Sequence, residues 1–353
     1  MTFQDLGGWR AILGSLVERQ DLTREQAAAA MGQILSGEAT PVQIAGYIIA
    51  LRMKGETVDE MVGMVDAMLQ AAAPVDLGEL TETTIDIVGT GGAPTRRVHA
   101  LNVSTMASLV AAGAGARVCK HGNRRASSTS GSFDLLDALG VPIELDGVAV
   151  ARCVREAGVG FCFARSFHPA MRHAGPVRAE LGVPTVFNFL GPLSNPARVL
   201  RQLIGVSDLR MAPTVVGVLQ TRGSPRAMVV HGADGMDELT TTGPSTVFEL
   251  QGGQVRTFEL DPRDLGLAVV DADQVRGGAP EENAAIAHRV LAGERGPYRD
   301  IVTLNAAAGL WVAGEVDDLS TGLERARDAI DSGRAAQVLA RLIEVASSAA
   351  GDR

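Results

Sequence analysis

The sequence predicts an α/β fold. A small N-terminal all-helical domain over residues 1–80 is followed by a larger α/β domain over residues 81–353, with a central, mainly parallel sheet flanked by helices. Helix-start signals follow one another through residues 8–73, whereas short β-branched runs alternate with helical patterns from Ile85 onward. The chain has 353 residues, of which 46% are hydrophobic, and this is enough to bury more than one core.

The helical domain is marked by three helix starts. Segments 23–26 and 57–60 both match Thr-x-x-Gln/Glu, a capping box that satisfies backbone N–H groups in the first turn. Thr40, followed by proline, is an N-cap with proline at the first helical position. Apolar residues such as Ile44 and Ile48 recur at helical spacing. We therefore expect consecutive helices here.

Short β-branched runs predict the strands of the α/β domain. The candidate strands are 85–88, 117–119, 185–188, 227–230 and 246–250. A helix is expected over residues 133–139, where Gly140 ends it. Because helical patterns separate most of these runs, the strands should be mainly parallel.

A glycine loop follows the first predicted strand. The loop contains Gly89, Thr90, Gly91 and Gly92, and it leads to Asn102, Ser104 and Thr105 at the start of an apolar helical run. Glycine lets the backbone approach a ligand closely, and a helix N-terminus carries partial positive charge. Pro94 breaks the dinucleotide-binding fingerprint, and the P-loop ending is absent from the sequence. The loop therefore predicts a different phosphorylated ligand.

The next loop, residues 120–132, supplies charge for such a ligand. It follows the predicted strand 117–119 and holds three cations, one histidine, four serines and no acid. Loops after successive parallel strands meet at one edge of the sheet, which is where open α/β sheets bind ligands. The two loops together predict a site for several phosphates on one small molecule.

Charge and composition argue against several other classes. The formal net charge of −9 does not favour binding of nucleic acid through bulk electrostatics. Cys119, Cys153 and Cys162 lie in apolar stretches, which is typical of packed, reduced thiols. No signal peptide and no membrane-spanning apolar run is evident in the sequence, so we expect a cytoplasmic protein that does not contact membranes.

Several motifs together resemble those of the anthranilate phosphoribosyltransferase family. They are the Gly-Thr-Gly-Gly loop, Asn102-Val103-Ser104-Thr105, Lys120-His121-Gly122-Asn123-Arg124, the run 183–196, His231-Gly232 with Asp237-Glu238, and Asn305-Ala306-Ala307. In order, they span nearly the whole chain. This family transfers the phosphoribosyl group of phosphoribosyl pyrophosphate (PRPP) to the amine of anthranilate, giving N-(5-phosphoribosyl)anthranilate and pyrophosphate in tryptophan biosynthesis.

The resemblance implies an active site between the two domains and a homodimer formed through the helical domain. We also expect a later segment of the chain, near residues 167–185, to belong to the helical domain. The resemblance implies that PRPP is bound by Gly89, Thr90, Gly91, Gly92, Asn102, Val103, Ser104, Thr105, Lys120, His121, Gly122, Asn123, Arg124, Ser127, Ser128 and Ser132. It implies that anthranilate is bound by Gly89, Asn123, His168 and Arg178.

Asp237 and Glu238 are the candidate ligands for magnesium. A departing pyrophosphate gains negative charge, and Mg²⁺ commonly binds one or two carboxylates together with substrate phosphates. The resemblance assigns Mg²⁺ to this pair and to Ser104, with two ions expected beside bound PRPP. We interpret the nearby Asp234 as an exposed loop acid.

The carboxylate of anthranilate needs an arginine beside an apolar wall. The residues alone leave Arg172 and Arg178 equally plausible, and the resemblance selects Arg178 with Asn123 as its partner. An aromatic amine is neutral at physiological pH, so no general base is nominated. Positioning the amine and stabilising the pyrophosphate should supply most of the acceleration.

The glycine loop departs from the family's pattern. Ala93-Pro94 replaces an Asp-Gly pair, Ala100 replaces a hydroxyl residue, and the connection 93–101 is longer than usual for the family. We hypothesise that at least one of Arg96 and Arg97 folds over the pyrophosphate and offsets the missing contacts, the alternative being that both are solvated loop residues.

Three alternatives are compatible with parts of the pattern. Pyrimidine-nucleoside phosphorylases share the architecture, but their signature has a lysine and a serine where Ile87 and Val88 stand. A non-catalytic relative that binds nucleic acid would show a basic surface and lack the Asp237-Glu238 pair. The same chemistry on a substituted anthranilate, in a secondary pathway, would leave the motifs unchanged.

Overall fold

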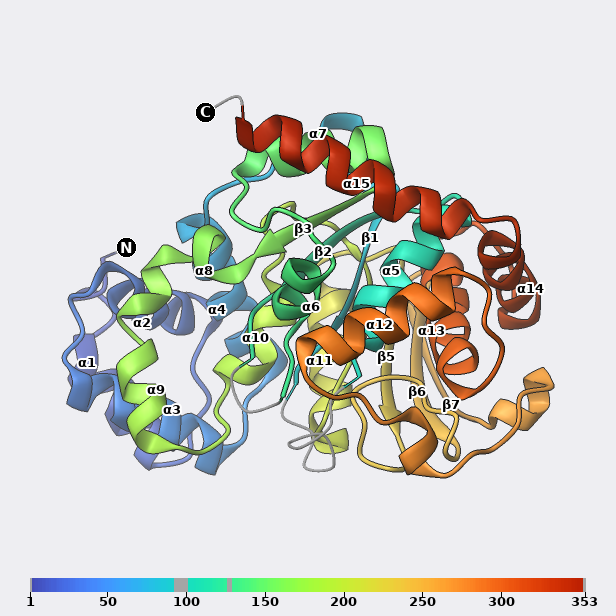
Figure 1. Cartoon of the computed structure of the whole chain (residues 1–353). Coiled ribbons are helices and arrows are strands. Elements are labelled where there is room, and N and C mark those ends of the chain that lie inside the picture. The colour runs from blue at the N-terminus through green and yellow to red at the C-terminus, as the bar shows by residue number, and fades with distance from the viewer. Residues whose placement is uncertain (1, 92–100, 126–128, 352–353) are drawn as a thin grey trace.

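The computed structural model describes residues 2–91, 101–125 and 129–351 (Figure 1). The N-terminal bundle consists of α1 (Gly8–Val17), α2 (Arg24–Ser36), α3 (Pro41–Lys54) and α4 (Val58–Ala71). Thr23, Thr40 and Thr57 each close a capping box at the start of α2, α3 and α4. The predicted helix starts are therefore confirmed, because the side chains satisfy backbone N–H groups that the first helical turn leaves open.

The α/β domain is built on a seven-stranded sheet, counted over the described residues. The strands are β1 (Thr84–Gly89), β2 (Arg117–Gly122), β3 (Val159–Phe163), β4 (Arg201–Gly205), β5 (Arg226–Gly232), β6 (Ser245–Gln251) and β7 (Gln254–Leu260). Their order is β3-β2-β1-β4-β5-β6-β7. Strands β1 to β5 run parallel, and β6 and β7 are antiparallel additions at one edge. The prediction of a mainly parallel sheet is confirmed.

The strand order reverses at β1. The chain adds β2 and β3 on one side of β1 and then returns to add β4 and β5 on the other. The register pairs Gly89 at the end of β1 with Gly205 at the end of β4. Ligands of open α/β sheets bind at the carboxyl ends of strands where the order reverses. This topology places a crevice next to the predicted glycine loop.

Helices cover both faces of the sheet. Ile85 and Ile87 of β1 belong to one hydrophobic cluster with α5 (Val103–Gly113), α13 (Pro297–Ala313) and α15 (Arg334–Gly351). Val88 and Ile204 belong to a second cluster with the N-terminal bundle and α11 (Ala212–Thr221). Alternate side chains of a strand point to opposite faces, so a strand covered on both faces presents apolar side chains to both.

The remaining helices complete the chain. They are η1 (Gly78–Glu82), α6 (Ser132–Ala138), α7 (Gly147–Ala157), α8 (Ala164–Phe167), η3 (Pro169–Arg172), α9 (Gly175–Leu181), α10 (Phe187–Leu193), η4 (Leu209–Met211), η5 (Pro262–Leu265), η6 (Ala272–Val275), α12 (Pro280–Leu291) and α14 (Leu319–Asp331). The helices η3 and α9 pack against α2 and α3, as the green and blue segments of Figure 1 show. Ala174 and Val177 are buried there in the cluster of the bundle.

The predicted strand 185–188 is wrong. The backbone N–H of Thr185 donates to Asn188 Oδ1 at 3.0 Å, and α10 begins at Phe187. Val186 and Phe187 are buried against the helical bundle and not in the sheet. A short apolar run does not by itself distinguish a buried strand from a buried helical turn. The strands β3, β4 and β7 were not among the predicted ones.

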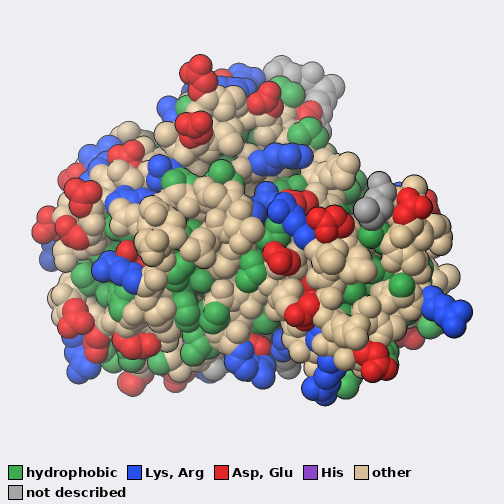
Figure 2. Space-filling view, turned by 180° about the vertical axis from the view of Figure 1, so that it is seen from behind, with side chains coloured by type: hydrophobic (Ala, Val, Ile, Leu, Met, Phe, Trp, Pro, Cys, Tyr) green, Lys and Arg blue, Asp and Glu red, His purple; other side chains and the backbone are tan. Residues whose placement is uncertain are grey.

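The remaining features agree with the composition. Cys119, Cys153 and Cys162 are buried free thiols. Within the described ranges, no helix is both long and apolar enough to cross a membrane. Acidic and basic side chains are interspersed on the face shown in Figure 2.

Candidate active site

A cavity of about 760 Å³ opens at the carboxyl edge of the sheet. Its lining comes from the ends of β1 and β2, the start of α5, the segment from α8 to α10, and the loop after β5. This volume is in the range of sites that enclose small molecules. The lining holds six cationic side chains, Lys120, Arg124, Arg125, Arg165, Arg172 and Arg178, and two carboxylates, Asp237 and Glu238. The cavity is therefore suited to an anionic ligand.

The glycine loop is anchored to two neighbouring segments. The backbone N–H of Thr90 donates to Gly205 O at 2.9 Å, and that of Gly91 donates to Asp237 Oδ2 at 2.7 Å. A Cβ atom built on Gly89 would lie 2.2 Å from Asp237 Oδ2. The glycine at position 89 is thus required by the close approach of a carboxylate, besides any approach of a phosphate.

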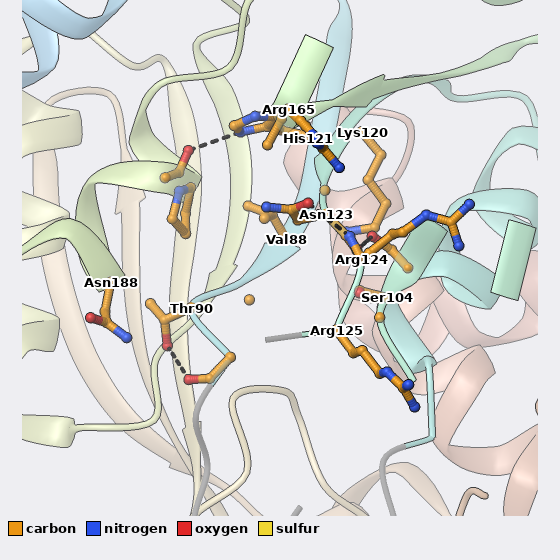
Figure 3. A pocket seen from close by; sticks show the side chains of 18 of the residues that line it. Val88, Thr90, Ser104, Lys120, His121, Asn123, Arg124, Arg125, Arg165 and Asn188 are labelled. Atoms are coloured by element: carbon orange, nitrogen blue, oxygen red, sulfur yellow. Dashed lines mark hydrogen bonds between the residues drawn. The ribbon is translucent and has the colours of Figure 1, made fainter. Parts of the chain in front are cut away.

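Lys120 lies at the floor of the cavity. Its ammonium group donates to Ile87 O at 2.6 Å, and the residue is only 2% exposed. Burial lowers the pKa of the Lys120 amine, while nearby carboxylates act in the opposite direction. Figure 3 shows Lys120 and Ser104 on the same side of the cavity, with Thr90 and Asn188 across from them.

A buried carboxylate supports this floor. Asp86 accepts hydrogen bonds from His121 N (3.2 Å) and from Asn195 Nδ2 (2.8 Å), and Asn195 also donates to Cys119 O. Burial raises the pKa of Asp86 to about 6, although Lys120 and these hydrogen bonds favour its charged form. Neither Asp86 nor Asn195 was predicted. The one available signal was an acid at a buried position of the first strand.

Two neutral histidines form part of the wall. His121 Nδ1 lies 2.9 Å from Gly191 O, His168 Nε2 lies 2.9 Å from Ser194 O, and the ring centroids are 5.0 Å apart. Burial lowers the pKa of His121 to about 3, and burial also lowers the pKa of His168. A carbonyl oxygen only accepts, so each of these ring nitrogens carries the proton.

The two candidate arginines differ in their surroundings. Arg178 is half-buried, and its guanidinium carbon lies 5.1 Å from the centroid of the Phe187 ring. Burial lowers the pKa of Arg178. Arg172 is exposed, and its closest hydrogen bond, to Pro169 O, is long at 3.4 Å. Both line the cavity, but only Arg178 is stacked on an aromatic wall.

The residues predicted to bind PRPP do not all line the cavity in the same way. Arg124 forms ion pairs with Asp134 (3.0 Å) and Asp137 (2.8 Å) of α6, although its side chain lines the cavity. Gly122, Asn123 and Ser132 also line it, and Ser132 Oγ donates to Asn123 O at 3.1 Å. Val103 is fully buried in the core and does not belong to the lining. Gly92, Ser127, Ser128 and the loop residues Ala93, Pro94, Arg96, Arg97 and Ala100 lie outside the described residues.

The acidic pair is on the loop between β5 and β6. Asp237 and Glu238 are 4% and 6% exposed, and they line the cavity together with the half-buried Ser104. The interpretation of Asp234 as an exposed acid is wrong. It is partly buried and accepts hydrogen bonds from the hydroxyls of Thr240 (2.9 Å) and Thr242 (2.6 Å). Asp234 thereby shapes the loop that carries the pair.

The donor set fits magnesium. No cluster of three or more histidine, cysteine, aspartate and glutamate side chains suited to a metal occurs in the described part of the chain. Two carboxylates and a hydroxyl are hard oxygen donors, and Mg²⁺ takes its remaining ligands from substrate phosphates and water. The chain therefore offers a site that needs a phosphorylated substrate to be complete.

Several lining residues were not predicted, among them Arg165, Asn188 and Ser130. Arg165 follows β3, Asn188 is in the first turn of α10, and Ser130 precedes α6. The first two lie on segments whose secondary structure was not predicted correctly. Ser130 lies within the second loop, but no motif residue marks it.

The chain matches a glycosyl transferase family over both of its domains. Residues 81–336 match its α/β domain, and residues 10–72 match its helical bundle domain. The anthranilate phosphoribosyltransferase of Arthrobacter sp. (strain FB24) is 52% identical over 343 residues, which cover 95% of each chain. The chain belongs to the anthranilate phosphoribosyltransferase family.

Solved structures agree with this assignment. The anthranilate phosphoribosyltransferase of Thermus thermophilus superposes with a TM-score of 0.89 at 42% identity, over 95% of this chain and 99% of that one. The Saccharomyces cerevisiae enzyme in complex with PRPP and Mg gives a TM-score of 0.87 at 29% identity, over 96% and 98% of the two chains. A second yeast structure, in complex with 4-fluoroanthranilate, gives 0.85 at 27% identity over the same shares.

Proposed function

We propose that the large cavity binds PRPP and anthranilate together, and that the chain joins them there to give N-(5-phosphoribosyl)anthranilate and pyrophosphate. As a member of its family, the chain is an enzyme of tryptophan biosynthesis. The observation that carries the proposal is that one cavity holds the glycine loop, a buried lysine, a pair of buried carboxylates and an arginine stacked on an aromatic ring.

PRPP is proposed to occupy the side of the cavity formed by the ends of β1 and β2. The glycine loop and the start of α5 line this side, and Lys120 adds a positive charge there. Charge-assisted hydrogen bonds from such donors are stronger than neutral ones. This arrangement would hold the pyrophosphate before, during and after its departure from the sugar.

Ser104, Asp237 and Glu238 would hold magnesium, with two ions as the expected number. Bound there, Mg²⁺ neutralises the charge that develops on the pyrophosphate. The carboxylate of Asp237 already accepts from Gly91 N, so the acidic loop and the glycine loop are coupled before substrate binds.

Anthranilate is proposed to occupy the opposite side, near His168 and Arg178. The Arg178 guanidinium would bind the carboxylate, and its stacking on Phe187 restricts its orientation. Asn123 would bind the same carboxylate. The neutral rings of His121 and His168 add an uncharged wall next to the substrate ring.

The chemistry follows from position and charge. Substitution at the sugar C1 proceeds through a transition state in which the sugar is positive and the pyrophosphate increasingly negative. The amine attacks in its neutral form, and its surplus proton leaves to solvent or to product pyrophosphate. The chain's contribution is to align the amine with C1 and to stabilise the departing group.

Assembly is also part of the proposal. We regard residues 1–80, together with the segment near 167–185, as one domain and residues 81–353 as the other. The helices α1 and α3 of the bundle expose Val17, Val42 and Met53 by 70% or more. Exposed apolar side chains on neighbouring helices favour burial against a second copy, which gives a homodimer through the helical domain.

The test is an assay of the purified chain with PRPP, Mg²⁺ and anthranilate. We expect anthranilate fluorescence to disappear with the release of one pyrophosphate per anthranilate consumed. Excess chelator should stop the reaction, and added Mg²⁺ should restore it. Asp237→Asn and Glu238→Gln should each lower kcat/KM at least about tenfold, because each removes an anionic ligand of the Mg²⁺ that would stabilise the departing pyrophosphate. Near-normal rates in both variants would contradict the metal assignment.

A further inference from the structure

Asn102, at the start of α5, is held by a buried network that joins three distant segments. Its Oδ1 atom accepts hydrogen bonds from Ser130 Oγ (2.9 Å) and from Asn283 Nδ2 (2.9 Å). Its Nδ2 atom donates to the backbone oxygen of Ser130 at 3.2 Å. Asn283 is fully buried in α12 and accepts a hydrogen bond from Gly278 N at 2.8 Å.

These bonds determine which way the Asn102 amide faces. An amide oxygen has two lone pairs, so the two donors saturate Oδ1. One N–H of Nδ2 bonds to Ser130 O, and the other is what the amide can offer to the cavity that Asn102 lines. Turning the amide by 180° would set nitrogen against the Asn283 amide and oxygen against Ser130 O, which costs both sets of bonds. The cavity is thus presented with a donor.

We infer that Asn283 is a positioning residue for phosphate binding, because it donates to Asn102 Oδ1 and so keeps the Asn102 N–H directed toward PRPP. The inference rests on the proposed function, since it takes a phosphorylated substrate to occupy this side of the cavity. Asn283 does not line the cavity and acts only through Asn102. It is 181 residues away in the sequence, and no phosphate-binding motif includes it.

The test compares Asn283→Ala with wild type by calorimetric titration with PRPP in Mg²⁺ and by steady-state kinetics. We expect the Kd and KM for PRPP to rise about tenfold, as for loss of a hydrogen bond to a charged group. The kcat at saturating PRPP should stay within about threefold, because Asn283 does not contact the reacting atoms.

A double-mutant cycle separates positioning from general damage. In an Asn102→Ala background, Asn283→Ala should have little further effect on the Kd for PRPP, since the two residues act as one unit. Thr303→Val is the matched control. Thr303 is fully buried in α13, and its hydroxyl donates to Arg299 O at 2.9 Å, so this variant should lose stability without losing PRPP affinity.

Asn283→Asp provides a second variant if Asn283→Ala does not fold. It keeps an acceptor for Gly278 N and, once ionised at pH 8.5, has no proton to donate to Asn102, so the same loss of PRPP affinity is expected. An unchanged Kd for PRPP, or an equal rise with and without Asn102, overturns the inference. If wild type remains active in that case, the proposed function stands. A wild-type protein that neither binds PRPP nor consumes anthranilate overturns both.

Discussion

At the scale of single residues, burial decides which groups of the site are charged. Lys120 and Asp86 lie together beneath the cavity, almost out of contact with water, and each favours the charged form of the other. His121 lies next to them, but burial and the neighbouring His168 lower the pKa of its imidazole, so that it remains neutral even though Gly191 O accepts a hydrogen bond from it. The site therefore combines a paired buried charge with an uncharged wall.

Arg178 and Arg172 offer a matched pair of variants. Arg178→Ala should raise the KM for anthranilate at least about tenfold and leave the KM for PRPP nearly unchanged, because a half-buried guanidinium binds a carboxylate more strongly than an exposed one. Arg172→Ala should change both constants little. Lys120→Ala should show the reverse pattern: the KM for PRPP should rise, and the KM for anthranilate should change little. If Arg178→Ala raised only the KM for PRPP, the placement of the two substrates would be wrong.

His121 should make the folded state sensitive to acid. Its folded pKa of about 3 lies below the ordinary value, so the unfolded chain binds a proton below about pH 6.5 that the folded chain refuses. The contribution of the neutral His121 to the free energy of unfolding is therefore complete above about pH 6.5 and is lost as the pH falls toward 3. We expect the free energy of unfolding in urea to drop less between pH 7 and pH 5 in His121→Asn than in wild type, by on the order of 1–2 kcal/mol.

The control for this measurement is His288→Asn, which replaces an exposed histidine on α12. It should show the same pH dependence as wild type. If His121→Asn and wild type lose equal stability on acidification, the imidazole of His121 is not held neutral by the fold.

At the scale of elements, the correct predictions concern helices and loops that depend on residues close together in the sequence. Thr23, Thr40 and Thr57 cap helices through atoms three residues away, so the sequence contains the whole interaction. The glycine loop and the cationic loop were predicted for the same reason. The segment 185–188 failed because its apolar side chains pack against a bundle that lies far away in the sequence. Asp86 and Asn283 are likewise defined by distant partners.

The loop that carries Asp237 depends on a glycine of the neighbouring strand. A Cβ atom on Gly205 would lie 1.6 Å from the backbone oxygen of Asp237, so Gly205→Ala must displace that backbone. We expect the melting temperature to fall by several degrees and the Mg²⁺ concentration for half-maximal activity to rise. Gly243→Ala, on the same β5–β6 connection, has no atom within 4 Å of the added carbon and should resemble wild type. Equal behaviour of the two variants would show that the acidic loop tolerates displacement.

At the scale of the whole molecule, the reversal of strand order and the two hydrophobic clusters place the cavity. The ends of β1 and β2 line the side proposed for phosphate, and the segment 167–193, which packs on the helical bundle, lines the side proposed for the aromatic substrate. Asp66 of α4 pairs with Arg222 after α11, and Arg52 of α3 pairs with Asp208, so ion pairs connect the bundle to the sheet domain. The relative placement of the two substrates thus depends on how the bundle is held.

The proposed dimer would bury two exposed apolar side chains of α3. Val42 and Met53 are 82% and 70% exposed, and their spacing along α3 corresponds to about three turns, so both lie on one stripe of the helix. Wild type should sediment as a dimer of the 36.8 kDa chain, and Val42→Glu/Met53→Glu should sediment as a monomer, because buried carboxylates without partners oppose association. The stability of the single chain should change little, since both side chains are exposed in it. Val148→Glu is the matched control, because Val148 is 77% exposed on α7 of the other domain and should not affect assembly. A monomeric wild type, or dissociation by Val148→Glu alone, would place the interface elsewhere or remove it.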